Sequence, residues 1–155
     1  MELKHLYEMT SLERYNFWRT NLLEAQKFWA TVNPDNVDLC DWRDPEGEEL
    51  DEIVDYSTPP SCGTLACFGG WLPWAPYFAE MGVRQNPGRG TPEIGAGERY
   101  ECGSNVAKYL FGEWYLFDSR ESREGGTDHA VAATRIANRL AEVERVIDEL
   151  TRPEA

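Results

Sequence analysis

Two stretches of the chain place large apolar residues at three- and four-residue steps, the spacing of one face of an α-helix. In residues 10–30 the apolar positions are Leu12, Tyr15, Trp18, Leu22, Ala25 and Trp29. In residues 128–150 they are Ala133, Ile136, Leu140, Val143, Ile147 and Leu150. Thr10 has capping-box spacing to Glu13, and Thr127 can cap the second stretch. The pattern predicts two long helices packed against each other.

Shorter elements are predicted between these two helices. Thr64 is a plausible cap for a short helix over residues 65–72, and a further helical turn is expected over residues 76–81. Residues 84–103 are rich in glycine and proline, which predicts a loop or a weak hairpin and the most mobile part of the chain. A helix is then expected over residues 104–111.

The length of 155 residues and the hydrophobic content of 41% suit one domain with its own core. We predict a mainly α fold, or an α+β fold with a small hairpin, forming a compact helical bundle over residues 1–155. An apolar stripe like that of residues 128–150 is usually core packing and only sometimes a dimer seam. A homodimer through the C-terminal helix is therefore left open.

Charge narrows the choice of partners. The chain has 28 acidic and 15 basic residues and a formal net charge of −13, so nucleic acid and anionic membranes should repel it. No apolar run approaches the roughly 20 residues of a membrane span, and the first residues lack the pattern of a secretory signal. The expected location is the cytoplasm, and the expected partner is a protein with a basic surface. The alternative is that the charge serves solubility alone.

Residues 35–55, here called the acidic segment, hold ten carboxylates against one basic residue, Arg43. Such crowding destabilises a fold slightly, whereas scattered charges would serve solubility equally well. The concentration therefore favours a local potential matched to a basic partner, with Trp42 as an aromatic anchor. The predicted partner-binding residues are Asp38, Asp41, Trp42, Asp44, Glu48, Asp51 and Glu52. The alternative is a solvated loop with Trp42 buried in the core.

Cysteine and histidine offer two chemical alternatives, a zinc site and a cysteine nucleophile. The cysteines lack the Cys-x-x-Cys spacing that is usual for a zinc site. Nothing in the sequence brings the candidate nucleophile Cys62 close to a histidine. We interpret Cys62 and Cys67 as structural thiols at a helix start rich in small residues, and expect no enzymatic activity, metal or cofactor. The alternative function is a metal-binding or cysteine-dependent protein centred on those two residues. The candidate ligands and bases considered are Cys40, Cys62, Cys67, Cys102, His5 and His129.

The string at residues 62–71, Cys-Gly-Thr-Leu-Ala-Cys-Phe-Gly-Gly-Trp, resembles a group of small phage and prophage proteins of unknown activity. The resemblance covers roughly residues 60–150, and departs from the pattern at Pro73 and Pro76. Its other landmarks are Ala107, Tyr109, Leu110, Leu116, Phe117, Thr127, Arg135 and Ile136.

This resemblance implies a phage-type accessory protein that acts in an infected or lysogenic bacterial host. Carboxylates on an ordered surface can imitate the phosphates of nucleic acid and occupy a basic groove. The resulting hypothesis is an inhibitor or adaptor of a nucleic-acid-binding defence enzyme, of the anti-CRISPR or anti-restriction type.

Overall fold

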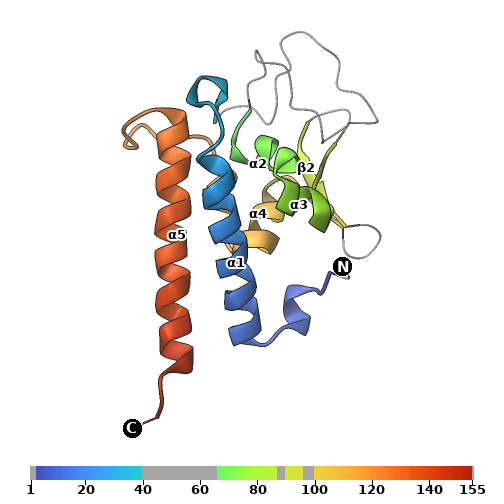
Figure 1. Ribbon diagram of the computed structural model, residues 1–155, viewed down its shortest axis with the longest axis vertical. Coiled ribbons are helices and arrows are strands. Elements are labelled where there is room, and N and C mark those ends of the chain that lie inside the picture. Colours follow the sequence, from blue (N-terminus) through green and yellow to red (C-terminus); the bar gives the residue numbers. More distant parts are fainter. Residues whose placement is uncertain (1–2, 40–65, 87–89, 96–99, 155) are drawn as a thin grey trace.

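A computed structural model of the protein describes residues 3–39, 66–86, 90–95 and 100–154 (Figure 1). Its two longest helices, α1 (Ser11–Trp29) and α5 (Asp128–Thr151), run side by side in opposite directions. The hydroxyl of Thr10 accepts a hydrogen bond from the Glu13 amide, and that of Thr127 accepts one from the Ala130 amide. Both long helices, both caps and their mutual packing are therefore confirmed.

Most of the predicted apolar stripes of α1 and α5 are buried in the core. The buried members are Trp18, Leu22, Ala25, Trp29, Ile136, Leu140, Val143 and Ile147. Leu12 and Leu150, which also belong to the predicted stripes, are 37% and 45% exposed. Both lie at the same end of the antiparallel pair, one in the first turn of α1 and the other in the last turn of α5.

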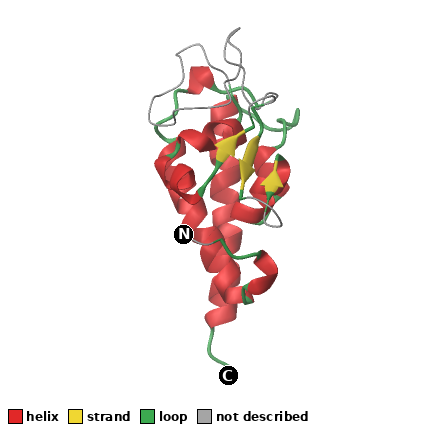
Figure 2. Ribbon diagram, turned by 90° about the vertical axis from the view of Figure 1, so that its right-hand side faces the viewer, coloured by secondary structure: helices red, strands yellow, loops and turns green. Residues whose placement is uncertain are grey.

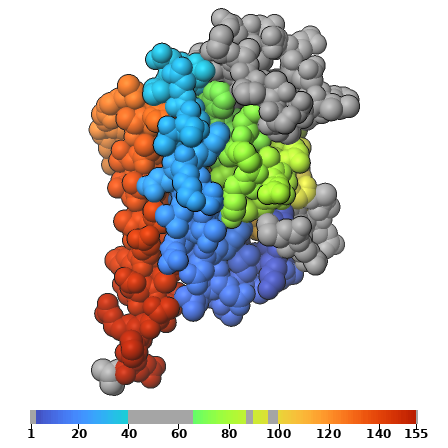
Figure 3. All heavy atoms as spheres, in the orientation of Figure 1, coloured from blue at the N-terminus to red at the C-terminus, as the bar shows by residue number. Residues whose placement is uncertain are grey.

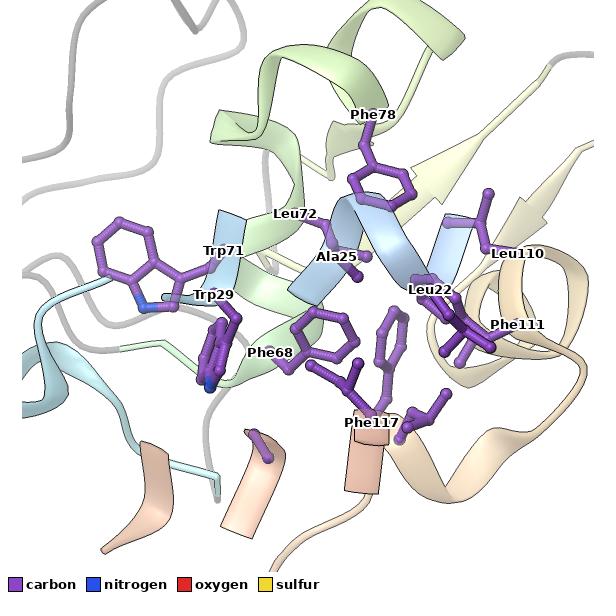
Figure 4. Packing of buried hydrophobic residues seen from close by; sticks show 14 of the residues in the cluster. Leu22, Ala25, Trp29, Phe68, Trp71, Leu72, Phe78, Leu110, Phe111 and Phe117 are labelled. Atoms are coloured by element: carbon purple, nitrogen blue, oxygen red, sulfur yellow. The ribbon is translucent and has the colours of Figure 1, made fainter. Parts of the chain in front are cut away.

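The short elements pack on the other side of α1, so that α1 lies between α5 and residues 66–86 (Figure 3). They include five short helical segments within residues 68–81 and 104–117. The rings of Phe68, Phe78, Phe111 and Phe117, which belong to these segments, meet in the core (Figure 4). Phe68 lies 5.6 Å from both Phe111 and Phe117 between ring centroids, and Phe78 lies 5.8 Å from Phe111. The elements are α2 (Phe68–Trp71), η3 (Leu72–Trp74), α3 (Pro76–Met81), α4 (Ser104–Phe111) and η5 (Trp114–Phe117), with η1 (Leu6–Glu8) and η2 (Pro34–Asn36) elsewhere.

The helix expected over residues 65–72 begins later than predicted. Cys67 is its N-cap. The helix does not start earlier because the backbone N–H and C=O of Ala66 are hydrogen-bonded to Asn36 and Asp38 instead. The predicted cap, Thr64, lies outside the described residues. The helix of residues 76–81 is confirmed, and it ends at Gly82 with a φ of +106°, a conformation that favours glycine.

Residues 84–102 contribute a small antiparallel sheet, which confirms the hairpin alternative and makes the fold mainly α with a β element (Figure 2). Its strands are β1 (Arg84–Gln85), β2 (Pro92–Ile94) and β3 (Glu101–Cys102), in that order. Residues 87–89 and 96–99 lie outside the described residues, so the mobility of this region stays a prediction. None of the described helices is both long and apolar enough to cross a bilayer.

Side chains from the two long helices cap the C-terminal end of α4, whose last carbonyl groups have no partner within their own helix. The Trp18 indole donates to the Tyr109 carbonyl at 3.0 Å, and the Asn21 amide donates to the Leu110 carbonyl at 2.9 Å. The Arg139 guanidinium donates to the Phe111 carbonyl at 2.9 Å. These bonds fix the position of α4 on the helix pair.

Gly112 completes this junction. Its φ is +83°, and a Cβ placed there would lie 2.5 Å from Nη2 of Arg139 and 3.0 Å from the Trp18 ring. Glycine is therefore required for both conformation and space, and it ends α4 as the sequence predicted.

Candidate functional site

The structure describes only the beginning of the acidic segment. Of the seven predicted partner-binding residues, Asp38 is described and is half-buried. The other six, Asp41, Trp42, Asp44, Glu48, Asp51 and Glu52, lie outside the described residues. The site is therefore built from the two points where the chain enters and leaves residues 40–65. Residues 36–39 and 66–67 are called the base of the acidic segment below.

The two halves of the base are joined by a short parallel bridge between Val37 and Ala66. The Asp38 amide donates to the Ala66 carbonyl at 3.1 Å, and the Ala66 amide donates to the Asn36 carbonyl at 3.2 Å. Val37, Leu39 and Ala66 are buried. The described residues directly before and after positions 40–65 therefore lie side by side, held by backbone bonds in an apolar setting.

The indole of Trp71 makes a third hydrogen bond to the base of the acidic segment. Its Nε1 donates to the Asn36 carbonyl at 3.0 Å, so that carbonyl accepts from both Trp71 and Ala66. Trp71 belongs to α2 (Figure 4), which connects the base to the phenylalanine core.

The N-terminus of α5 holds the other face of the base. Oδ2 of Asp128 accepts a hydrogen bond from the Leu39 amide at 3.1 Å, while Oδ1 accepts one from Arg120 Nη1 at 2.8 Å. A carboxylate in the first turn of a helix is also favoured by the helix dipole. Asp128 therefore stabilises the first turn of α5, pairs with Arg120 and holds the base through the Leu39 amide.

His129 pairs with Trp29 beside this contact. The two rings stack with centroids 5.0 Å apart and planes 9° apart. The Trp29 indole donates to the His129 carbonyl at 2.9 Å, and His129 Nε2 lies 2.8 Å from the Trp29 carbonyl. Because a carbonyl only accepts, Nε2 is the donor in this contact. His129, one of the candidate bases, is half-buried and ties α5 to the end of α1.

Cys67 lies buried at the start of α2, where its thiol serves as the N-cap. It is 2% exposed, its Sγ accepts a hydrogen bond from the Gly70 amide at 3.4 Å, and burial raises its pKa to about 11. A thiol with that pKa stays protonated at neutral pH, which opposes nucleophilic attack and metal ligation. Cys102 is exposed on the small sheet, and Cys40 and Cys62 lie outside the described residues. Within the part of the chain that is described, no group of three His, Cys, Asp or Glu side chains could hold a metal ion.

The sequence interpretation missed two arginines that α5 turns inward. Arg135 donates to the carbonyls of Tyr115, Asp118 and Ser119 and to both carboxylate oxygens of Glu124. The Arg135 bonds hold the pKa of Glu124 at about 2, below its ordinary value near 4.5. The only signal in the sequence is that Arg135 and Arg139 are four residues apart beside the apolar stripe, whereas their carbonyl partners are distant in sequence.

Comparisons with family models, with curated proteins and with solved structures give no match for this chain.

Proposed function

We propose that the protein binds a partner protein that has a basic surface, and that it does so through the acidic segment. The supporting observation is the anchored base, in which residues 36–39 and 66–67 are joined by backbone bonds and tied to α2 and α5. A charged segment whose two ends are held in place loses less entropy on binding than a free tail. The contact residues of this proposal are Asp38, Asp41, Trp42, Asp44, Glu48, Asp51 and Glu52.

The charge of the segment indicates what kind of partner would fit. Residues 40–65 carry eight carboxylates and one arginine. A basic groove that normally holds nucleic acid presents the complementary potential, and such complementarity speeds association and selects partners. Together with the resemblance to phage proteins, this favours an inhibitor that competes with nucleic acid for a host defence enzyme.

The test compares two variants that each lose four carboxylates. In the first, Asp41, Asp44 and Asp51 are replaced by Asn and Glu52 by Gln. In the matched control, Glu80, Glu144 and Glu154 are replaced by Gln and Asp148 by Asn. These four control positions are exposed and lie outside the acidic segment. The two variants have the same net charge, so a difference between them reports the location of the charge.

The measurement is capture of proteins from a nuclease-treated bacterial lysate, identified by mass spectrometry, at low and high salt. Parent and control should retain the same basic, nucleic-acid-binding protein, and the acidic-segment variant should lose it. Capture should weaken steeply with salt, because exposed charges are screened over roughly 8 Å at physiological ionic strength. Equal capture by both variants would show that the acidic segment is not the site. A captured protein should then be inhibited in its nucleic-acid binding by the parent and not by the acidic-segment variant.

A further inference from the structure

The Asp128 carboxylate joins two parts of the molecule that are far apart in sequence. One oxygen accepts a hydrogen bond from the Leu39 amide at 3.1 Å, at the last described residue before positions 40–65. The other binds Arg120 at 2.8 Å, with the two side chains only 23% and 33% exposed. An ion pair that is partly shielded from water is stronger than a pair on the open surface.

Arg120 is itself held in place from the opposite side. Its Nη2 donates to the carbonyl of Glu124, whose carboxylate is gripped by Arg135 at 2.6 Å and 2.9 Å. Arg135 is buried on α5, two turns beyond Asp128. A closed chain of polar contacts therefore runs from Arg135 through residues 120–124 back to the first residue of the same helix.

We propose that the Arg120–Asp128 pair is an ionic latch that holds residues 37–39 onto α5. Opening the latch releases the Leu39 amide from α5 while the α1–α5 pair stays folded and the Val37–Ala66 bridge remains. The latch and the helix pair are held by different forces. The packing between the two helices is apolar, whereas the latch is made of two charges and one amide. The latch does not depend on the proposed function. Its consequence for partner binding does, and that consequence is weaker binding when the Leu39 amide is released, because the binding segment is less preorganised.

The test is amide hydrogen exchange of the ¹⁵N-labelled full chain, followed residue by residue by NMR. Asp128→Ala removes both latch contacts, and Arg145→Gln is the control. Arg120→Gln removes the ion pair and the guanidinium bond to the Glu124 carbonyl, and keeps the carboxylate that accepts from the Leu39 amide. Arg145 pairs with Glu149 at 2.7 Å on the exposed face of the same helix. The Leu39 amide should exchange about tenfold faster or more in Asp128→Ala, because a charge-assisted hydrogen bond is lost. Exchange should rise less in Arg120→Gln and stay unchanged in Arg145→Gln.

Three outcomes would overturn the latch. Unchanged exchange at Leu39 in Asp128→Ala means that Asp128 does not hold the Leu39 amide. If the Leu39 amide exchanges faster in Asp128→Ala but not in Arg120→Gln, the contact is a simple hydrogen bond and the ion pair is not part of a latch. Equal acceleration at amides in the middle of α1 and α5 means that the helices open together with the latch.

Partner binding is measured separately, with the same variants in the lysate capture. Asp128→Ala should retain the captured protein several-fold less well than Arg145→Gln does. If the parent captures no partner, the proposed function fails while the exchange data still decide the latch. If Asp128→Ala frees the Leu39 amide but captures the partner as well as the parent, the latch has no part in binding.

Discussion

The two ends of the α1–α5 pair are built differently. At the end that carries the base of the acidic segment, Trp29 stacks on His129, the two residues exchange hydrogen bonds, and Asp128 binds both Arg120 and the Leu39 amide. At the other end Leu12 and Leu150 are partly exposed. The pair formed there by Arg145 and Glu149 lies on the surface, with side chains 65% and 55% exposed.

The difference shows what an apolar stripe specifies and what it leaves open. A stripe brings two helices together, but apolar packing is non-directional and tolerates small shifts along the helix axis. Hydrogen bonds between Trp29 and His129 have fixed lengths and directions, so they set the register of α1 against α5. These directional contacts lie beside the base of the acidic segment, which is where a binding segment would need a defined geometry.

The largest effect is expected for Trp29→Ala. This side chain is 1% exposed and packs on Phe68 and His129, so its removal should lower the free energy of unfolding by about 3–5 kcal/mol. Urea denaturation followed by circular dichroism measures the change. Trp29→Phe keeps a ring and loses the indole hydrogen bond to the His129 carbonyl, and should lose about 1–2 kcal/mol. A loss below about 1 kcal/mol for Trp29→Ala would contradict the special role of this end.

The sequence was sufficient for the elements and for part of the seam. Thr10 and Thr127 marked the helix starts because a hydroxyl at that position accepts from a free amide, an interaction local in sequence. The small sheet was expected as a weak hairpin, since its strands are too short to show alternation. Each of these features depends on residues a few positions apart.

Contacts distant in sequence could not be predicted in the same way. The pairing of Ala66 with Val37 delays the start of α2, and nothing near Ala66 in the sequence shows that Asn36 will accept its amide hydrogen. From its sequence context Arg139 is expected to be a surface charge. Only the fold shows that it binds the Phe111 carbonyl at the end of α4. For the candidate site, composition identified the acidic segment, whereas its attachment through Asp128 required the fold.

An intermediate effect on stability is expected at low pH, at the end of the helix pair that carries the base of the acidic segment. The pKa of Glu124 is about 2 in the folded protein and near 4.5 ordinarily, because Arg135 stabilises the carboxylate. A folded-state pKa below the unfolded value adds stability above about pH 4.5, and this contribution is lost as pH falls towards 2. Glu124→Gln should therefore show a flatter decline of the unfolding midpoint between pH 4.5 and 2 than the parent does. Glu149→Gln, in the surface pair, should follow the parent, and equal slopes for all three proteins would contradict the role of the Arg135 contact.

The smallest effect is expected for Leu150→Ala, at the other end of the pair. Because this side chain is 45% exposed, its truncation should change the free energy of unfolding by less than about 0.5 kcal/mol. The thermal midpoint should also be independent of protein concentration in both proteins, since the buried part of the α5 stripe packs on α1 of the same chain. A homodimer through the C-terminal helix would give the opposite result. The parent's midpoint would then rise with concentration, Leu150→Ala would remove that dependence, and both ends of the pair would be specified by contacts rather than only one.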